Sequence, residues 1–183
     1  MTLLYRGRVI STAAAVVWGE SGGTIMGLSV TKTLSLDALA NGSSRMGASH
    51  DLGADWHQEW IAILCVETGT APTAGNAAHA YMSESIDGST WPGKVTGSDA
   101  AYPTTVVDNL KQLGVPITSL LTSNDSNTVL QQLGQIYTPL SRYIAPVIYN
   151  AMGQAFRDEV TASNNGSGLI LVPAKEYYSD TEP

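Results

Sequence analysis

Cysteine is almost missing from this chain of 183 residues, which contains only Cys65 and therefore no internal disulfide. A chain of this length can bury about 70% of its unfolded surface in one domain, so its core does not need disulfides. Cys65 lies in the apolar run Ile-Ala-Ile-Leu-Cys-Val at 61–66. We predict a small buried side chain at this position rather than a reactive thiol.

Charge is also scarce. Charged residues make up 14% of the chain, whereas about 25% is usual. Nine basic residues against sixteen acidic ones leave a net charge of −7 and form no basic stripe. This charge repels nucleic acid and anionic membranes, so we expect neither as a partner. Gly, Ser, Thr, Ala and Asn fill the gap, which suits a β protein with many turns or one partly covered by neighbours.

Long apolar runs are absent as well. The N-terminus carries Arg6 and Arg8 ahead of an apolar patch, but the continuous run at 13–18 has only six residues. A signal peptide needs an apolar stretch of about 7 to 15 residues. No run approaches the roughly 18 apolar residues of a membrane-spanning helix. We therefore expect neither a cleaved signal peptide nor a transmembrane segment.

Residues 143–150 have the strongest strand pattern in the chain. The segment Tyr-Ile-Ala-Pro-Val-Ile-Tyr-Asn is apolar at both odd and even positions and rich in β-branched and aromatic residues. Because strand side chains alternate between two faces, we predict a strand with little water on either side. Pro146 cannot donate a ladder hydrogen bond, which predicts an edge position or a bulge there.

Further strands are predicted between turn-forming stretches rich in Gly, Asn and Asp. They cover residues 13–18, 28–36, 56–67, 76–85, 117–122, 128–137 and 169–172. We expect the 128–137 strand to pair with 143–150 as a hairpin, and residues 45–55 and 88–104 to be loops. Residues 105–113 are the one helix candidate. About seven to nine evenly spaced strands favour a sandwich or a jelly roll over an α/β fold.

The sequence Gly-Glu-Ser-Gly-Gly at 19–23 matches the G-x-S-x-G pattern of a nucleophilic serine. That pattern requires a helix directly after the serine, and Thr24 and Ile25 begin a helix poorly. The protease version requires an earlier His and Asp, and residues 1–20 contain neither. We interpret the stretch as a Gly-rich turn and predict no catalytic residue.

Four possible metal ligands, His50, Asp51, Asp55 and His57, lie within eight residues. Imidazole and carboxylate groups suit zinc or iron where they converge. These residues fall in and beside a predicted loop, and His79 is the only other histidine. We prefer the interpretation of a polar loop and predict neither a metal nor another cofactor.

Three tryptophans offer a different kind of site. Trp56, Trp60 and Trp91 could form a platform on which sugar rings stack. Tryptophans at strand starts and loop bends more often close the ends of a core. Carbohydrate binding therefore stays an alternative.

Several segments occur in an order that resembles the small jelly-roll virion proteins of tailed bacteriophages that decorate or cement capsids. They are Asp-Trp at 55–56, Ala-Pro-Thr-Ala-Gly at 71–75, Tyr-Met-Ser-Glu-Ser at 81–85, Asp-Gly-Ser-Thr-Trp-Pro at 87–92, the run 141–153, and Leu-Ile-Leu-Val-Pro at 169–173. The resemblance covers about residues 28–173. With it, we predict an all-β, antiparallel β-sandwich of jelly-roll type with at most one short helix. We predict an arm or a first edge strand at residues 1–12, and we prefer the edge strand. We predict a single domain at 13–174 and an acidic tail that frays at 175–183.

The resemblance implies a capsid decoration protein that is not an enzyme. It implies a homotrimer bound to the major capsid protein on the outer capsid surface of the virion. Similar jelly rolls serve as receptor-binding parts of tails or fibres, so a receptor-binding or carbohydrate-binding protein is the first alternative function. A hydrolase or metal-dependent enzyme is the second alternative function. We expect Leu4, Tyr5, Arg6 and Arg8 to contact the capsid protein, since two cations in an acidic chain are otherwise poorly explained.

Overall fold

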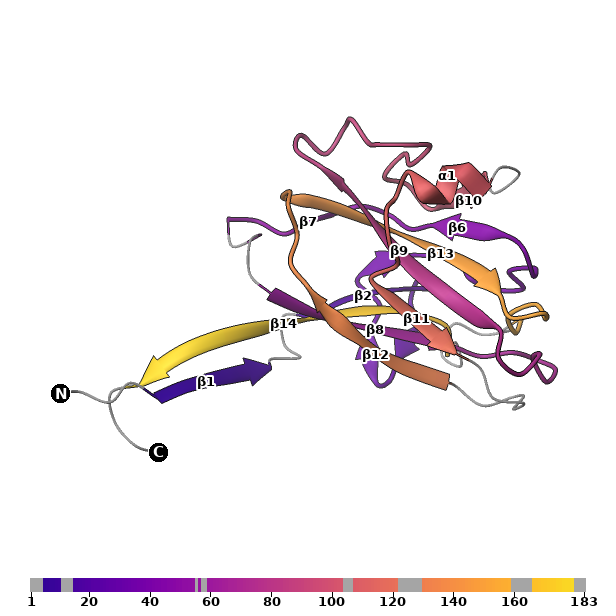
Figure 1. Cartoon of the computed structure of the whole chain (residues 1–183), viewed down its shortest axis with the longest axis horizontal. Helices are drawn as coiled ribbons and strands as arrows, with labels where there is room; N and C mark the ends of the chain where they lie inside the picture. The colour runs from indigo at the N-terminus through magenta and orange to yellow at the C-terminus, as the bar shows by residue number, and fades with distance from the viewer. Residues whose placement is uncertain are drawn as a thin grey trace.

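The computed structural model describes residues 5–10, 15–54, 56, 59–103, 107–121, 130–158 and 166–179. This part of the chain is almost entirely β structure. Figure 1 shows two sheets packed face to face, with the short helix α1 (Val107–Lys111) at one side. The prediction of an all-β sandwich with at most one short helix is confirmed for the described residues.

Each of the two sheets has six strands. The first has the order β12-β8-β14-β2-β5 with β1 beside β14, and consists of β1 (Tyr5–Ile10), β2 (Val16–Gly19), β5 (Lys32–Thr33), β8 (Glu59–Val66), β12 (Leu130–Tyr137) and β14 (Gly168–Ser179). The second has the order β10-β6-β13-β9-β11 with β7 beside β13, and consists of β6 (Ser44–Met46), β7 (His50–Asp51), β9 (Ala77–Ser85), β10 (Ala100–Tyr102), β11 (Thr118–Leu121) and β13 (Tyr143–Ala151). A separate hairpin joins β3 (Thr24–Ile25) to β4 (Leu28–Ser29).

Eight of these strands form a jelly roll. In chain order they are β2, β6, β8, β9, β11, β12, β13 and β14. The first sheet places them as β2-β14-β8-β12 and the second as β6-β13-β9-β11. All six pairings among them are antiparallel. The first strand thus lies beside the last and the second beside the seventh, which is the nested arrangement of a jelly roll.

The core lies between the two sheets. Side chains of β2, β8, β13 and β14 meet there, among them Trp18, Leu64, Ile144, Ile148 and Leu171, all of them fully buried. The alternating burial along β8 and β9 shows why these sequences form strands: every second side chain enters the core. Each such Leu or Ile contributes roughly 1.5–3 kcal/mol.

Both sheets are also covered on part of their outer faces. Val95, Tyr102, Leu110 and Leu113, from the excursion between β9 and β11, pack with Met46, Ala145 and Val147 of the second sheet. The β3–β4 hairpin covers Val17, Cys65 and Ile170 of the first sheet. This explains the strand that is apolar on both faces. β13 contacts the core on one side and the excursion on the other, as its sequence predicted.

Of the two predicted alternatives for Pro146, the edge position is wrong and the bulge is present in the neighbouring segment, because the register shifts by one residue between the pair Val147 and Met46 and the pair Ile144 and His50. β13 is central, and Pro146 is opposite Met82 of β9. The Pro146 carbonyl accepts a hydrogen bond from the Gly47 N–H at 2.9 Å, so this side of the backbone faces the segment between β6 and β7. The neighbouring strand is interrupted there, between Met46 and His50. The missing N–H therefore costs no ladder hydrogen bond.

The predicted hairpin between 128–137 and 143–150 is wrong, because β12 pairs with β8 and β13 pairs with β9 in the other sheet. The predicted strand at 28–36 is only the short β4 and β5, although Leu34 and Leu36 are fully buried. Strands β6, β7 and β10 lie where loops were expected. Within the described residues, the helix and the other expected strands appear close to their predicted positions, except that the strand expected at 169–172 is β14 and extends to Ser179.

Candidate functional site

A two-stranded ribbon leaves the jelly roll. Figure 1 shows indigo β1 and the yellow far half of β14 extending together away from the body. β14 pairs with β8 from Gly168 to Ala174, and from Ala174 to Ser179 it pairs with β1. The prediction that the last strand ends at residue 172 and that a tail frays from residue 175 is therefore wrong for 173–179. Of the N-terminal residues 1–12, β1 places Tyr5–Ile10 in a strand, and residues 1–4 and 11–12 lie outside the described part of the chain.

The ribbon and the rest of the chain carry opposite charge. The ribbon strands hold Arg6, Arg8 and Lys175 against Glu176, so they carry +2. Residues 11–173 carry −7, and Asp180 and Glu182 after the ribbon carry −2. The register places Glu176 opposite Arg8 and Tyr178 opposite Arg6. An isolated two-stranded ribbon is at best marginally stable in water, so a ribbon of this kind gains from contact with another surface.

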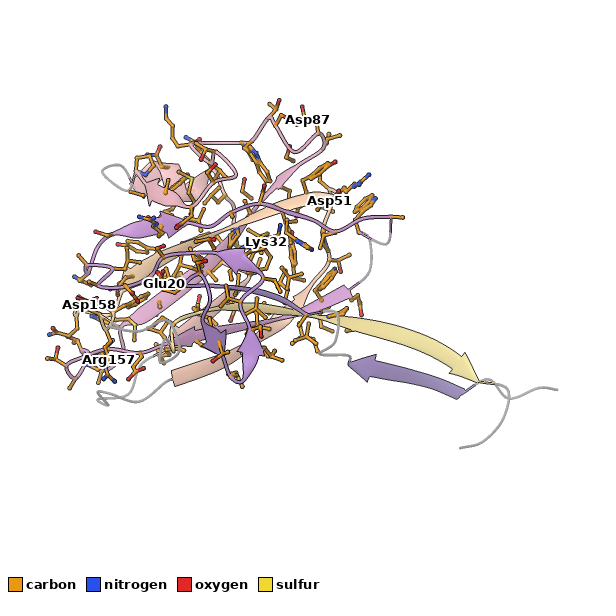
Figure 2. All side chains as sticks on the ribbon, turned by 180° about the vertical axis from the view of Figure 1, so that it is seen from behind. Glu20, Lys32, Asp51, Asp87, Arg157 and Asp158 are labelled. Carbon is orange, nitrogen blue, oxygen red and sulfur yellow. The ribbon has the colours of Figure 1, made fainter. Side chains whose placement is uncertain are left out.

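An open pocket of about 590 Å³ lies at one end of the second sheet. It is formed where the end of β9 and the following loop meet the segment before β13. The lining residues are Glu84, Ser85, Ile86, Asp87, Thr90, Trp91, Pro92 and Ser141. Two of them are carboxylates and none is basic. Figure 2 shows Asp87 on the body, while the ribbon extends away from it.

Asp87 is held by its own loop. Its Oδ1 accepts hydrogen bonds from the backbone N–H groups of Thr90 at 2.7 Å and Ser89 at 2.8 Å, and from the Ser85 hydroxyl at 3.0 Å. These donors, the Thr90 N–H above all, hold the pKa of Asp87 well below its usual range. The chain turns directly after Asp87, where Gly88 has a φ of 73°. Asp87 is thus a fixed, ionised group.

Glu84 is held by the end of β12 and by the loop that leads from it into β13. The Tyr137 hydroxyl donates to Glu84 Oε1 at 2.7 Å, and the Leu140 N–H donates to Oε2 at 2.7 Å. Burial raises the pKa of Tyr137, and the charge of Glu84 raises it further, so the phenol stays a donor. Each carboxylate oxygen keeps capacity for another donor, because a carboxylate offers about four acceptor positions.

Trp91 forms a wall of the pocket and is half-buried. Its indole packs over Gly97, where a Cβ would lie only 2.9 Å from Trp91 Nε1. Gly97 has a φ of 72°, which suits glycine and brings the backbone under the ring. Beside it, Ile86 is 88% exposed. The pocket thus combines an aromatic wall, two oriented carboxylates and an exposed aliphatic side chain.

The residues of the predicted sugar platform are not brought together. Trp60 is only 4% exposed and belongs to the core between the sheets. Trp91 packs with the cluster on the outer face of the second sheet. Trp56 is half-buried in the turn before β8. Of the three, only Trp91 lines the pocket, and its partners there, Glu84 and Asp87, were not predicted as site residues.

The four candidate metal ligands have separate environments where they can be described. Asp51 accepts two hydrogen bonds from Arg142 at 2.5 Å, which lower its pKa to about 2. His50 packs edge-on against Trp18 at 6.1 Å, and burial lowers its pKa. Asp55 and His57 lie outside the described residues. Among the residues described, no three His, Cys, Asp or Glu side chains are grouped to hold a metal ion.

Of the four predicted partner-binding residues, Tyr5, Arg6 and Arg8 lie in β1, and Leu4 lies outside the described part of the chain. The Gly-rich stretch at 19–23 is a turn, as predicted, closed by the Gly23 N–H donating to the Glu20 carbonyl at 3.0 Å. Cys65 is fully buried, also as predicted, and burial raises the pKa of its thiol to about 12.

The described fold and site define an all-β jelly-roll protein with a projecting ribbon. Comparisons with protein-family models, with curated proteins and with solved structures found no match. Within the described residues, no helix has the length and apolar character needed to cross a membrane.

Proposed function

We propose that this chain is a structural protein of a bacteriophage virion, a capsid decoration subunit that stabilises the assembled shell through protein contacts. The observation that carries the proposal is the β1–β14 ribbon, which extends away from an acidic jelly-roll body and whose two strands together carry a charge of +2. A ribbon that is marginal alone is suited to bind a neighbouring protein. The jelly-roll fold agrees with the class of virion protein that the sequence resembles.

Stabilisation in this proposal is a mass-action effect. A subunit that binds the assembled shell, and not the loose capsid protein, stabilises the shell by RT ln(1 + [L]/Kd) for each site. At a free concentration 100 times Kd this is about 2.7 kcal/mol per site. A homotrimer on the outer capsid surface would bind through several contacts at once, which raises its effective affinity. The partner is the major capsid protein.

The test is co-sedimentation of the purified chain with assembled empty shells and, separately, with dissociated capsid protein. We expect saturable binding to shells, much weaker binding to dissociated protein, and shells that disrupt at a higher temperature once decorated. A variant lacking residues 1–10 should bind shells more weakly. Val115→Asp, at a side chain that is 83% exposed and remote from the ribbon in sequence, is the control and should bind as the wild type does. Equal, weak binding to shells and dissociated protein would refute the proposal.

A further inference from the structure

We propose that the pocket around Glu84, Asp87 and Trp91 receives Arg6 from the ribbon of a second copy of this chain. The inference rests on the proposed function for its setting, an assembly of copies on a shell. It adds the contact that joins one copy to the next, which pairs a ribbon on one body with an acidic pocket on its neighbour.

The pocket has the chemistry of a cation site. Glu84 accepts one hydrogen bond at each carboxylate oxygen, so each oxygen can accept another donor. Asp87 already accepts three donors of its own loop at Oδ1 and the Thr90 hydroxyl at Oδ2, so it contributes mainly its fixed negative charge. None of the described lining residues is basic, so nothing within the pocket balances the two negative charges. The Trp91 ring lines the pocket beside these two carboxylates. A planar guanidinium fits this combination best, because it donates to carboxylates in a fixed fork and stacks on aromatic faces.

The ribbon supplies the guanidinium. Residues directly opposite one another in an antiparallel pair are neighbours on the same face. The register places Glu176 directly opposite Arg8, whereas Arg6 is directly opposite Tyr178 and only diagonal to Glu176. Arg6 also lies nearer the far end of β1, a strand of six residues that spans about 20 Å. Arg6 is therefore the arginine we assign to the pocket.

The chain's other three arginines already have acidic partners. Arg45 pairs with Asp99 at 2.7 Å, Arg142 pairs with Asp51 at 2.5 Å, and Arg157 pairs with Glu67. Arg6 lies on a ribbon that extends away from the body on which Asp87 lies (Figure 2). The pocket of another copy is thus the acceptor we assign.

Charge complementarity also identifies the partner. The ribbon strands carry +2 and residues 11–173 carry −7, so one copy's ribbon is attracted to the next copy's body. The sequence assigned the N-terminal arginines to the capsid protein because two cations in an acidic chain needed a partner. Arg6 alone is reassigned, to the pocket of a second copy, and the capsid contact proposed above uses the rest of the ribbon. The contact joins different surfaces of the two copies, so it generates a closed ring or an open chain of subunits.

The experiment is sedimentation velocity of the full chain over a range of concentrations, without shells. We expect the wild type to self-associate, and Arg6→Glu to weaken association by about 30-fold or more, because it places a third negative charge beside the two carboxylates of the pocket. Ile86→Arg, which places a cation at the pocket mouth, should weaken association similarly. Ile86 is 88% exposed, so this change removes no core contact. The double variant Arg6→Glu/Ile86→Arg exchanges the charges and should regain part of the lost affinity.

Matched controls separate the site from general charge effects. Lys94→Glu makes the same charge change as Arg6→Glu at an exposed residue that does not line the pocket. Val115→Arg makes the same change as Ile86→Arg at a side chain that is 83% exposed. Both should associate as the wild type does. Far-UV circular dichroism checks that every variant is folded.

Three results would overturn the inference. They are a wild type that stays monomeric, test variants that associate as their controls do, and a double variant without recovery. A glycan-array signal that is lost on Ile86→Arg, with self-association unchanged, would assign the pocket to carbohydrate instead. Shell binding is read separately. If shells do not bind the chain but the Arg6 and Ile86 variants change self-association as expected, the proposed function fails and this inference stands. If shells bind the chain but the Arg6 and Ile86 variants self-associate as the wild type does, this inference fails and the proposed function stands.

Discussion

Replacing Asn150 by alanine should be among the most destabilising single polar substitutions in the described fold. The Asn150 side chain is fully buried at the end of β13. Its amide nitrogen donates to the carbonyls of Leu39 and Gln154, both at 2.8 Å, and its oxygen accepts from the Met152 N–H at 2.9 Å. One side chain thus connects β13 to the loop before β6 and to the turn that follows.

The magnitude follows from these three hydrogen bonds. Each contributes about 1 kcal/mol net, and a buried partner left unsatisfied costs about 1–3 kcal/mol. Leu39 and Gln154 are only half-buried, so water can reach part of the vacated space. We therefore expect Asn150→Ala to lower the free energy of unfolding by about 3 kcal/mol, a large part of the usual total of about 5–15 kcal/mol. For a chain of this size, that corresponds to a decrease in Tm of about 6–12 °C.

Urea unfolding followed by circular dichroism measures this difference. Asn41→Ala is the matched control, because Asn41 is exposed and its side chain accepts one hydrogen bond, from the Gly153 N–H at 2.8 Å. It should cost about 1 kcal/mol or less. Asn150→Asp adds a second test. Its buried carboxylate would face two carbonyl oxygens, so its pKa should be raised in the folded state and the destabilisation should decrease as pH falls from 7 toward 4. An Asn150→Ala variant within 1 kcal/mol of the wild type would refute this reasoning.

Three further predictions follow from individual residues. Gly153 has a φ of 84°, and a Cβ there would lie 2.5 Å from Thr73 Oγ1, whereas Gly22 has a φ of 78° and a Cβ there would meet nothing within 4 Å. Gly22→Ala should lower the free energy of unfolding by about 1–2 kcal/mol, and Gly153→Ala should lower it by clearly more. Equal losses would contradict the close approach of Thr73 to Gly153. Cys65 is fully buried with a pKa raised to about 12, so a disulfide reagent such as DTNB should label it only once urea unfolds the chain. Rapid labelling of the native protein would show that β8 is accessible. The pKa of His50 is lowered, chiefly by burial, so the unfolded chain binds this proton more readily and its contribution to stability falls as pH drops below about 6.5. His50→Gln should lose less stability than the wild type between pH 7.5 and 5.5, and parallel curves would show that His50 does not titrate differently on folding.

Much of the strand content was predictable, because alternation and turn residues are local properties. β8, β9, β11 and β13 lie within two or three residues of their predicted positions. The pairing of strands was not predictable in the same way. The sequence around Pro139 suggests a simple hairpin, yet β12 and β13 belong to different sheets. Short loops are compatible with either arrangement, and the choice depends on which faces bury the most apolar area.

The same limit applies to the segment at 28–36. Leu34 and Leu36 are both fully buried, as the alternating pattern indicated. Only two short pieces of the segment find ladder partners: Leu28 and Ser29 pair with β3, and Lys32 and Thr33 pair with β2. Alternation predicts which side chains are buried, but a strand also needs a neighbour with free backbone groups. That neighbour is supplied by a distant part of the chain.

The pocket could not be predicted from neighbouring residues in the sequence. Trp91 was singled out as a candidate aromatic, and Asp87 only as part of a turn. Glu84 was one residue in a strand. Their common site with Ser141 exists because β9 and β13 are paired, which brings residues more than 50 positions apart to one end of a sheet.

The sequence by itself determined that this protein is β-rich, that its cysteine is buried and that the segment at 143–150 is apolar on both faces. These properties depend on residue type and on neighbours within a few positions. Only the tertiary structure decided the jelly-roll order, the continuation of β14 into a ribbon with β1, and the acidic pocket. Each of these depends on backbone pairing between segments far apart in the chain, and the free energy of that pairing is a property of the whole fold.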